Sequence, residues 1–338
     1  MIYISLKKQK TESYNMNNED INAWFHHLKG DNLFERDDEK FVEYRKQWQE
    51  RPKNFDSGDF PLFLDVEVTN ACNLMCPYCA TTISNGKYKK GFIAKEHVEK
   101  MIEEGSRNGL YGIKFNVRGE PLLHPLIDYF VHYAKEHGLI DVYFNTNAML
   151  LTKIMCRKLI DARLDRISIS FDGYTKDVYE KNRVGSYFTT VIDNVKCLQN
   201  IKKELNVEYP RVRVQTIKLP EIDLDEYGNF WENMADEVAY LDYKDMGQKN
   251  KGVVWPAWKC PQLWQRMAVL WNGDIFPCNH DDELKAILGN VNSMSIKEAW
   301  FSRKERHMRT VHEHGGGHTL RVCDGCYLRN SEILKIKG

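Results

Sequence analysis

Between residues 62 and 243, short runs of β-branched and other apolar residues alternate with longer segments that place apolar residues at helical spacing. The short runs predict strands over 62–68, 112–117, 141–146, 166–171, 211–217 and 238–243. The longer segments predict helices over 95–108, 125–137, 152–163, 187–205 and 225–236. Strands that alternate with helices are typical of βαβ units, whose strands are parallel. The pattern therefore predicts an α/β fold, built as a partial or full α/β barrel or as a doubly wound sheet.

The segments on either side have different patterns. Residues 1–60 are polar and charged, with short amphipathic helices expected over 17–30 and 38–51, and the turn-forming residues of 51–61 are interpreted as a linker. From about residue 255, turns and cysteines replace the helical spacing, apart from a helix expected over 295–314. The sequence therefore predicts a helical N-terminal extension, a central α/β domain and a small cysteine-bearing C-terminal module, with these bounds: 1–60, 61–248 and 249–338.

The overall composition narrows the classes of function. The chain of 338 residues is 42% hydrophobic, which is enough for a sizeable core, and it has 48 Lys and Arg residues against 48 Asp and Glu residues. A net charge of zero argues against a general nucleic-acid binder, which usually needs a basic surplus. No apolar run reaches the length of about 18 residues that a membrane span needs, and the N-terminus lacks the order of a signal peptide. We therefore expect a cytoplasmic protein that binds neither membranes nor nucleic acid.

Nine cysteines are present. In a reducing compartment, clustered cysteines are more often metal ligands or catalytic groups than disulfides, and the odd count weakens a disulfide framework further. Cys156 and Cys197 fall inside predicted helices and match no ligand spacing, so we expect them to be small buried hydrophobic residues. The others form two clusters, one after the first predicted strand and one in the C-terminal module.

The stretch "VTNACNLMCPYCATT" places Cys72, Cys76 and Cys79 just beyond the first predicted strand. Parallel α/β folds have their active sites at the carboxyl ends of the strands. Structural zinc usually takes four protein ligands, whereas three thiolates can hold a 4Fe–4S cluster and leave one iron open for a non-protein ligand. A polar turn with Asn70 and Asn73 is a poor place for three packed cysteines. The pattern favours an iron–sulfur site over zinc, a disulfide or plain packing.

The motif "CNLMCPYC", in which the aromatic Tyr78 stands just before the last cysteine, resembles the signature of radical S-adenosylmethionine (SAM) enzymes. The resemblance implies a partial (β/α)6 barrel and a 4Fe–4S cluster, bound by the three cysteines, whose open iron chelates the amino and carboxylate groups of SAM. It also implies that reduction cleaves SAM to methionine and a 5′-deoxyadenosyl radical, which removes hydrogen from a substrate. A flavodoxin or ferredoxin is the electron donor that the resemblance implies.

The segment "NVRGEPLLHP", after the second predicted strand, resembles the Gly-Gly-Glu motif of this family, which meets the SAM amino group. Gly119 and Glu120 match that motif, and Arg118 stands where the first glycine is usual. A carboxylate at a strand end is a sensible partner for an ammonium group. The resemblance therefore implies that Gly119 and Glu120 contact SAM, while Arg118 raises a question about the local backbone.

Polar residues at the next strand ends resemble further SAM contacts. Asn145 and Asn147 in "VYFNTNAMLLT" match the strand that reaches the SAM ribose, and Ser170 in "ISISFDG" matches the next strand end. Arg183 follows at the place where related enzymes bind the SAM carboxylate. The resemblance covers roughly residues 62–245.

The C-terminal module contains Cys260, Cys278, Cys323 and Cys326, and four thiolates can close a zinc site or fully ligate a second iron–sulfur cluster. The succession "NGDIFPC", "LGNVNSMSIKEAWFS" and "CDGC" resembles the extension of radical SAM enzymes known as SPASM or, in a shorter form, twitch. The resemblance implies that these cysteines bind an auxiliary 4Fe–4S cluster, and zinc is the alternative. Gly273 is expected to form the turn of a hairpin that leads to Cys278.

Histidines near these cysteines give weaker signals. His312, His314 and His318 in "HEHGGGHTL" stand beside three glycines, and we expect a mobile loop there rather than a metal site. His280 and Asp281 follow Cys278, the second cysteine of the module, after one intervening residue. We expect these two residues to lie near the auxiliary cluster without binding it.

The resemblance leads to a functional hypothesis. The segment before the first predicted strand looks too short and too helical for the recognition domain that peptide-modifying relatives often carry. Other segments resemble radical SAM proteins found with surface-polysaccharide and small-molecule biosynthesis. We therefore expect an oxidoreductase that abstracts hydrogen from a hydroxylated, sugar-like or aminocyclitol-like small molecule, with the auxiliary cluster taking part in electron transfer. The alternatives are an epimerase, a peptide or protein maturase, and a zinc-stabilised binding module without catalysis.

The proton acceptor for such a reaction has no distinctive motif. Glu221 lies just past the fifth predicted strand, and Asp242, Lys244 and Asp245 lie at the end of the sixth. These positions face the mouth of a barrel if the predicted strands are right. They are weak candidates, because charged residues at such positions are commonly solvated.

Overall fold

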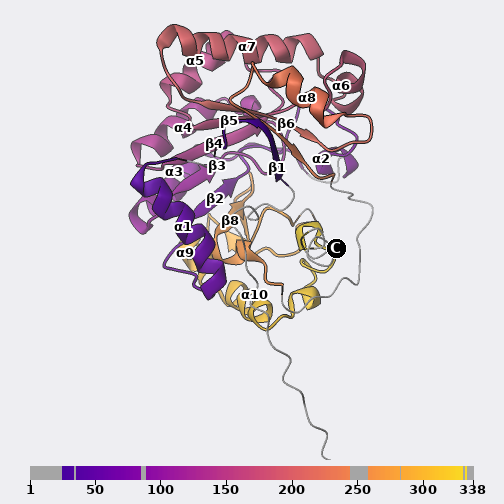
Figure 1. Cartoon of the computed structure of the whole chain (residues 1–338). Helices are drawn as coiled ribbons and strands as arrows, with labels where there is room; N and C mark the ends of the chain where they lie inside the picture. Colours follow the sequence, from indigo (N-terminus) through magenta and orange to yellow (C-terminus); the bar gives the residue numbers. More distant parts are fainter. Residues whose placement is uncertain are drawn as a thin grey trace, which may run out of the picture.

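The computed structural model describes residues 25–33, 36–84, 89–243, 258–281, 283–329 and 332. Over these residues the strands form a ten-stranded sheet in the order β1-β7-β6-β5-β4-β3-β2-β8-β9-β10. Figure 1 shows helices packed on one side of this sheet and the C-terminal segments on the other side. The protein therefore has an open, mixed sheet at its centre.

The central strands β2 to β7 are parallel and neighbour one another in chain order. Their bounds are β2 (Phe63–Val66), β3 (Gly112–Lys114), β4 (Asp141–Thr146), β5 (Arg166–Ser170), β6 (Arg211–Ile217) and β7 (Glu237–Leu241). Parallel neighbours need a crossover connection, which helices provide here. This arrangement is the partial (β/α)6 barrel that the resemblance implied, and it confirms the predicted strands.

The crossover helices cover the outer face of the barrel. They are α3 (Lys95–Asn108), α4 (Ile127–Glu136), α5 (Lys153–Asp161), α7 (Phe188–Leu205) and α8 (Leu224–Trp231), and they confirm the predicted helices. Shorter helices, of at most about two turns, were not predicted: α2 (Ala80–Ile83), η1 (Pro121–Leu123) and α6 (Lys176–Asn182). Within the described ranges, no helix combines the length and the apolar character that crossing a bilayer requires.

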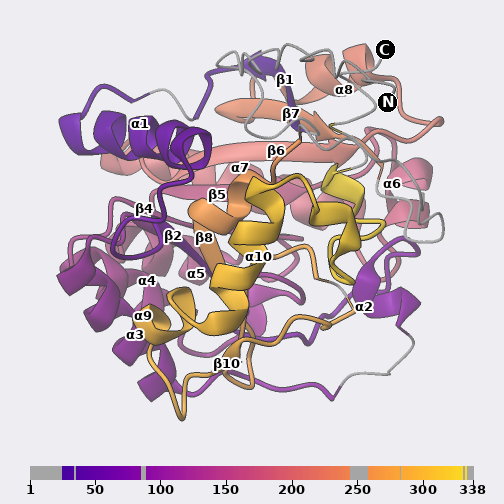
Figure 2. The ribbon, with the colours of Figure 1, turned by 90° about the horizontal axis from the view of Figure 1, so that it is seen from below.

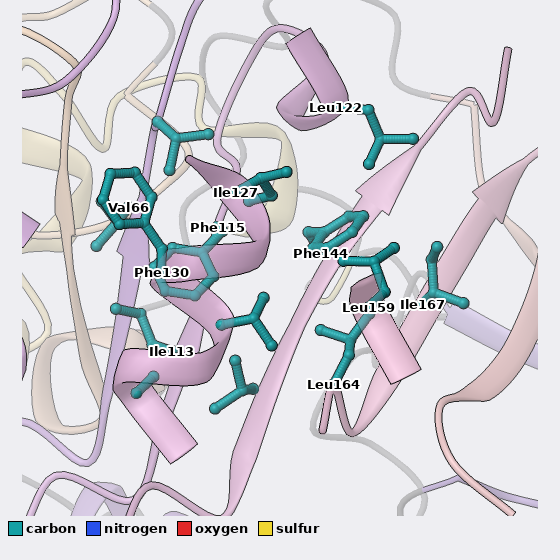
Figure 3. Close-up of a cluster of buried hydrophobic side chains, with 14 of the residues drawn as sticks. Val66, Ile113, Phe115, Leu122, Ile127, Phe130, Phe144, Leu159, Leu164 and Ile167 are labelled. Atoms are coloured by element: carbon teal, nitrogen blue, oxygen red, sulfur yellow. The ribbon is translucent and has the colours of Figure 1, made fainter. Parts of the chain in front are cut away.

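Apolar side chains fill the layer between the sheet and these helices. Ile113, Phe144 and Ile167 come from neighbouring strands and pack in one cluster with Phe130 of α4 and Leu159 of α5 (Figure 3). All of them are fully buried. Burying a side chain of this size stabilises the fold by about 2 kcal/mol. This layer therefore fixes the positions of the strands, and with them the positions of the strand ends.

The opposite, inner face of the central strands is polar, because successive side chains on a strand point to opposite faces. Charged side chains on this face form ion pairs between neighbouring strands: Arg166 with Asp141, Arg213 with Glu237, and both Lys114 and Arg266 with Asp65. Trp48 of helix α1 (Glu39–Asn54) lies 4.7 Å from the guanidinium of Arg266. The inner face of the barrel is thus a polar surface held in place by ion pairs and by α1.

The N-terminal segment differs in part from the prediction. Strand β1 (Phe25–Gly30) pairs antiparallel with β7 and covers that edge of the sheet. The helix predicted over 17–30 is therefore wrong for 25–30, and 17–24 lie outside the described residues. Helix α1 confirms the helix predicted over 38–51 and continues into the segment expected to be a linker.

The C-terminal module extends the other edge of the sheet. Strand β8 (Arg266–Val269) pairs parallel with β2, and β9 (Asp274–Phe276) and β10 (Gly289–Asn290) follow in antiparallel order. Gly273, with a φ of 87°, lies in the turn between β8 and β9 and confirms the predicted hairpin. The module is therefore continuous with the barrel rather than a separate body.

Helices complete the module. The prediction of a single helix over 295–314 is wrong in one respect, because this segment forms two helices, α9 (Ile296–Trp300) and α10 (Arg303–Glu313). The break between them includes Ser302, whose side chain accepts the N–H of Glu305 and so caps α10. Such an N-cap starts a new helix in a new direction. The short helices η2 (Pro261–Trp264) and η3 (Gly317–Thr319) both contact α10. Figure 2 shows α10 crossing in front of β8 on the open side of the sheet.

Candidate functional site

Cys72, Cys76 and Cys79 lie in the loop between β2 and α2, at the carboxyl end of the first parallel strand. The backbone N–H of Cys79 donates to the carbonyl of Cys76 at 3.1 Å, and α2 begins directly afterwards. Burial raises the pKa of Cys72 to about 11, and the nearby thiols of Cys76 and Cys79 add to the increase. The three thiols therefore lie near one another, and a bound metal cluster would supply the positive charge that allows them to ionise.

A buried carboxylate, Asp172, organises the wall beside this loop. It lies two residues beyond the end of β5 and accepts hydrogen bonds from the hydroxyl of Tyr78 and from the N–H of Ile217. Its Oδ2 also lies 2.5 Å from Nε of Arg183, and Nη1 of Arg183 lies 3.9 Å from Sγ of Cys76. Burial opposes the charge of Arg183, but Asp172 outweighs burial and raises the pKa of the guanidinium well above its usual value. Arg183 is therefore a fixed cation next to the cysteine loop.

Glu120 is a buried carboxylate in the loop after β3, where it is the N-cap of η1. Its Oε1 accepts hydrogen bonds from the N–H of Leu122 at 3.0 Å and from the hydroxyl of Thr146 at 2.6 Å, and its Oε2 accepts the N–H of Asn147 at 2.8 Å. Burial raises the pKa of Glu120 although these hydrogen bonds act in the opposite direction. The side chain of Asn147 donates in turn to Asn73 in the cysteine loop at 2.8 Å. The end of β4 thus connects Glu120 to the cysteine loop.

The remaining residues expected at SAM lie at the same edge of the sheet. Asn145 is near the end of β4, where its backbone N–H donates to the side chain of Asn116 at 2.8 Å. Ser170 is the last residue of β5 and pairs in register with Gln215 of β6. The structure therefore brings the expected SAM residues to the carboxyl ends of successive strands. Their individual roles toward SAM stay predictions.

The turn before Glu120 answers the question raised by Arg118. The positive φ of this turn, 74°, falls on Gly119. A Cβ at Gly119 would lie 2.3 Å from the carbonyl oxygen of Thr69, so the turn has room only for glycine. The side chain of Arg118 instead pairs with the buried Glu67, with 2.7 Å between Nε and Oε2. An ion pair thus accommodates the departure from the family pattern.

Replacing Gly119 with alanine is expected to lower the free energy of unfolding more than replacing Gly138 with alanine. Gly138 has a similar φ of 82°, but a Cβ there would meet nothing within 4 Å. Both variants meet the strain of a positive φ, about 1–2 kcal/mol, and only the variant at Gly119 adds a clash with the Thr69 carbonyl. Urea unfolding of both variants measures the difference. Equal losses of stability would contradict the role given to Gly119.

The module's cysteines, Cys260, Cys278, Cys323 and Cys326, line a common cavity. Burial raises the pKa of Cys260 and of Cys278, and the thiols of Cys323 and Cys326 add to both increases. Among the described residues, no group of three or more His, Cys, Asp or Glu side chains is arranged to hold a single metal ion. A cluster of several irons holds its thiolates farther apart than one ion does. Thiols that surround a buried cavity fit a cluster ligated by four cysteines.

The histidines of the module are placed differently from the prediction. His312 is fully buried in α10 and lines the cysteine cavity, so the expected loop is wrong for this residue. His314 follows the end of α10, and His318 belongs to η3. His280 lines the same cavity, and Asp281 is buried close by. The structure thus adds His312 to the residues expected near the second cluster.

The candidate proton acceptors lie at the rim of the barrel. Glu221 is exposed and pairs with Lys181 at 3.5 Å. Asp242 follows β7, and its carboxylate lies 3.2 Å from Nε2 of His26. Two further candidates lie outside the described residues: Lys244 and Asp245. Of the two described candidates, Asp242 thus lies beside an imidazole and Glu221 beside an ammonium group.

Sequence reasoning missed two buried carboxylates of this site. Asp172 directly follows the fourth predicted strand, and a carboxylate at a strand end is the signal that could have identified it. Glu67 stands in the apolar run "LFLDVEV", where it alternates with valines. This alternation indicates a strand with one polar face. Both residues pair with arginines that the sequence analysis had named, Arg183 and Arg118.

Family models match both parts of the chain. The model of the radical SAM superfamily matches residues 66–218, which contain the first cysteine loop and the strands up to β6. The SPASM model, an iron–sulfur cluster-binding domain, matches residues 260–327, which contain the four-cysteine cavity. This chain is a radical SAM enzyme with a C-terminal SPASM extension. A radical SAM domain holds a 4Fe–4S cluster with SAM, a SPASM domain holds auxiliary iron–sulfur clusters, and the two sets of converging thiols fit these groups.

Curated relatives of this radical SAM enzyme include GTP 3′,8-cyclases. The enzyme is 25% identical over 238 residues to that of Clostridium botulinum (strain Langeland), an alignment of 67% of this chain and 68% of the relative. It is 26% identical over 204 residues to that of Thermodesulfovibrio yellowstonii, an alignment of 58% of each protein. Several other such cyclases align over 57–58% of their own length. The chain thus spans little more than half of most of these relatives.

Solved structures with a similar fold include BtrN in complex with AdoMet and 2-DOIA, with a TM-score of 0.54 and 20% identity over 80% of this chain and 94% of BtrN. Streptococcus suis SuiB bound to precursor peptide SuiA has a TM-score of 0.57 and 15% identity over 84% of this chain and 75% of SuiB. Native anSMEcpe with bound AdoMet has a TM-score of 0.56 and 18% identity over 75% of this chain and 84% of anSMEcpe. At these identities the likeness shows the shared fold.

Proposed function

We propose that this radical SAM enzyme oxidises a hydroxylated small molecule of the sugar-like or aminocyclitol-like kind. The observation that carries the proposal is the polar inner face of the barrel. Ser168, Arg213 and Gln215 come from β5 and β6, and their ladder partners are the predicted SAM contacts Asn145 and Ser170. Adjacent rows of hydrogen-bonding side chains suit a ligand that carries hydroxyl or amino groups on neighbouring carbons.

The chain's own residues have distinct roles in the proposed reaction. Glu120 and Arg183 hold the ammonium and the carboxylate of SAM at the strand ends. When bound, SAM and the clusters supply the radical that removes a carbinol hydrogen and the acceptor for the remaining electron. A basic group at the rim of the barrel takes the hydroxyl proton. The substrate thereby loses one hydrogen atom, one proton and one electron, and its alcohol becomes a carbonyl.

The extent of the structural likeness supports a small-molecule substrate. The likeness to BtrN, whose structure contains 2-DOIA, covers 94% of that chain. The likeness to SuiB, whose structure contains a precursor peptide, covers 75% of that chain. The shared fold therefore extends over nearly all of BtrN and over three quarters of the peptide-bound protein.

The proposal predicts a defined fate for the substrate hydrogen. The reconstituted protein is incubated anaerobically with SAM, a reductant and a panel of polyols, hexoses and aminocyclitols deuterated at their carbinol carbons. We expect one compound to transfer deuterium into 5′-deoxyadenosine and to yield its carbonyl product in an equal amount. Mass spectrometry of the nucleoside and of the product measures both.

Other results would select the alternatives. Deuterium transfer without a carbonyl product, together with solvent hydrogen in the recovered compound, would indicate an epimerase. Turnover with peptides alone, with tight binding of a leader peptide, would indicate a maturase. Absence of iron and of SAM cleavage after reconstitution would leave only a binding module.

A further inference from the structure

His312 lies in the wall of the four-cysteine cavity. It is fully buried in the last turn of α10. The ring of Trp258 meets it edge-on, with 6.1 Å between the ring centroids. A Cβ at Gly317 would lie 2.4 Å from the imidazole Cε1, so the backbone of Gly317 lies directly against the ring. The imidazole therefore has a fixed position and little freedom to turn.

The contacts of the ring decide which nitrogen carries the proton. The backbone N–H of Cys260 donates to Nδ1 of His312 at 3.4 Å. A nitrogen that accepts a hydrogen bond carries no proton, so the proton of this imidazole is on Nε2. Nε2 lies 3.3 Å from Sγ of Cys323. The imidazole is therefore neutral and directs an N–H toward the sulfur of Cys323.

We propose that His312 donates a hydrogen bond to the Cys323 thiolate and thereby raises the reduction potential of the auxiliary cluster. The reduced cluster carries one more negative charge than the oxidised cluster, and an N–H directed at a ligand sulfur stabilises that extra charge. His312 is thus a positioning and tuning residue and not a ligand. The inference rests on the cavity cysteines being the cluster ligands, as proposed above.

The test uses the full-length chain with Cys72, Cys76 and Cys79 replaced by alanine, so that any iron bound belongs to the auxiliary site. The protein is reconstituted anaerobically with and without His312→Phe. Phenylalanine keeps the shape of the ring and removes the N–H. We expect both proteins to bind about four irons per chain. A redox titration followed by electron paramagnetic resonance should show a lower potential for the phenylalanine variant.

Further variants separate the hydrogen bond from a general effect on the fold. His312→Gln keeps an N–H donor near the position of Nε2 and should restore part of the potential. Gly317→Ala keeps the histidine, but the added methyl group displaces the imidazole. The reduction potential should therefore fall, as in His312→Phe. His307 is exposed on the same helix, and His307→Phe should leave the potential unchanged.

Three results would overturn the proposal in distinguishable ways. Normal iron content with an unchanged potential in His312→Phe would show that the hydrogen bond does not tune the cluster. A strong hyperfine coupling from labelled imidazole nitrogen would show that His312 is itself a ligand. If the chain that lacks only the three cysteines of the first loop binds no iron, the cavity holds no cluster. The proposed function would then also lose its electron acceptor.

Discussion

Replacing Cys76 with alanine is expected to abolish the cleavage of SAM and to remove about four irons per chain, because three thiolates are the minimum that holds a cubane cluster with one open iron. Cys76 is the most buried cysteine of the first loop, and Arg183 lies 3.9 Å from its sulfur. A water molecule could replace the lost thiolate as an iron ligand only by entering a buried site beside a fixed cation. Iron and sulfide analysis, together with chromatography of 5′-deoxyadenosine, measures both effects.

A matched control for this prediction is Cys156→Ala. Cys156 is fully buried in α5 and packs in the layer between sheet and helices, as expected for a small hydrophobic residue, and Cys197 is partly buried against the same layer. The control removes a buried thiol and creates a small cavity, at a cost of roughly 1 kcal/mol in the free energy of unfolding. Iron content and SAM cleavage should stay at the parent level. SAM cleavage by the Cys76 variant would contradict the placement of the cluster.

The barrel could be predicted from the sequence because its signal is local. Each parallel strand is a short β-branched run, and each crossover helix repeats its apolar positions at helical spacing, so a window of a few residues contains the evidence. Strands β4 and β6 and helix α3 have the predicted bounds for this reason. The cysteine motifs were equally readable, because metal ligands that come from one loop have a fixed spacing in sequence.

Strand β1 could not be predicted because its stabilising contacts lie far away in sequence. The segment "FHHLKG" has few apolar residues and no clear alternation. It becomes a strand because the edge of β7 offers unpaired backbone groups, and because the ring of His26 stacks on Tyr240 at 4.4 Å. Phe25 also lies under the guanidinium of Arg213, at 4.3 Å. These partners are far along the chain, beyond any local pattern.

Sequence reasoning named several site residues without the buried partners through which they act. Arg118 looked like a departure from a glycine motif, and only the structure shows that Glu67 compensates its charge. Likewise, His312 stands beside glycines that suggested a loop, but its helix buries it against Cys323. Pairs of this kind form between elements that are distant in sequence. A single sequence names the residues but not their partners.

The second large effect is expected from Asp172→Asn. Oδ2 of Asp172 faces the Tyr78 hydroxyl and Nε of Arg183, and Oδ1 faces the N–H of Ile217 and the hydroxyl of Thr216. Both oxygens therefore face donors. An asparagine side chain must direct its own NH2 group toward one of these two pairs of donors. It also leaves the largely buried Arg183 without a compensating charge.

Two consequences follow from this loss. Breaking a buried ion pair by removing one partner costs about 3–5 kcal/mol in the free energy of unfolding. Arg183 and Tyr78 also lose the carboxylate that holds them beside the cysteine loop. We therefore expect the dissociation constant for SAM to rise by roughly tenfold or more, which corresponds to the loss of one hydrogen bond between charged groups. Denaturant unfolding and equilibrium binding of SAM to the reconstituted protein measure the two effects separately.

Asp141→Asn is the matched control that separates stability from SAM binding. Asp141 also forms a buried ion pair, with Arg166 at 2.7 Å, but it begins β4 and so lies at the opposite end of the strand from the proposed SAM site. Its variant should lose comparable stability and bind SAM with an unchanged affinity. If both variants bind SAM equally well, Asp172 only stabilises the barrel. If both bind it more weakly to the same extent, the weakening reflects a loosened fold, and the proposed positioning of Arg183 by Asp172 is wrong.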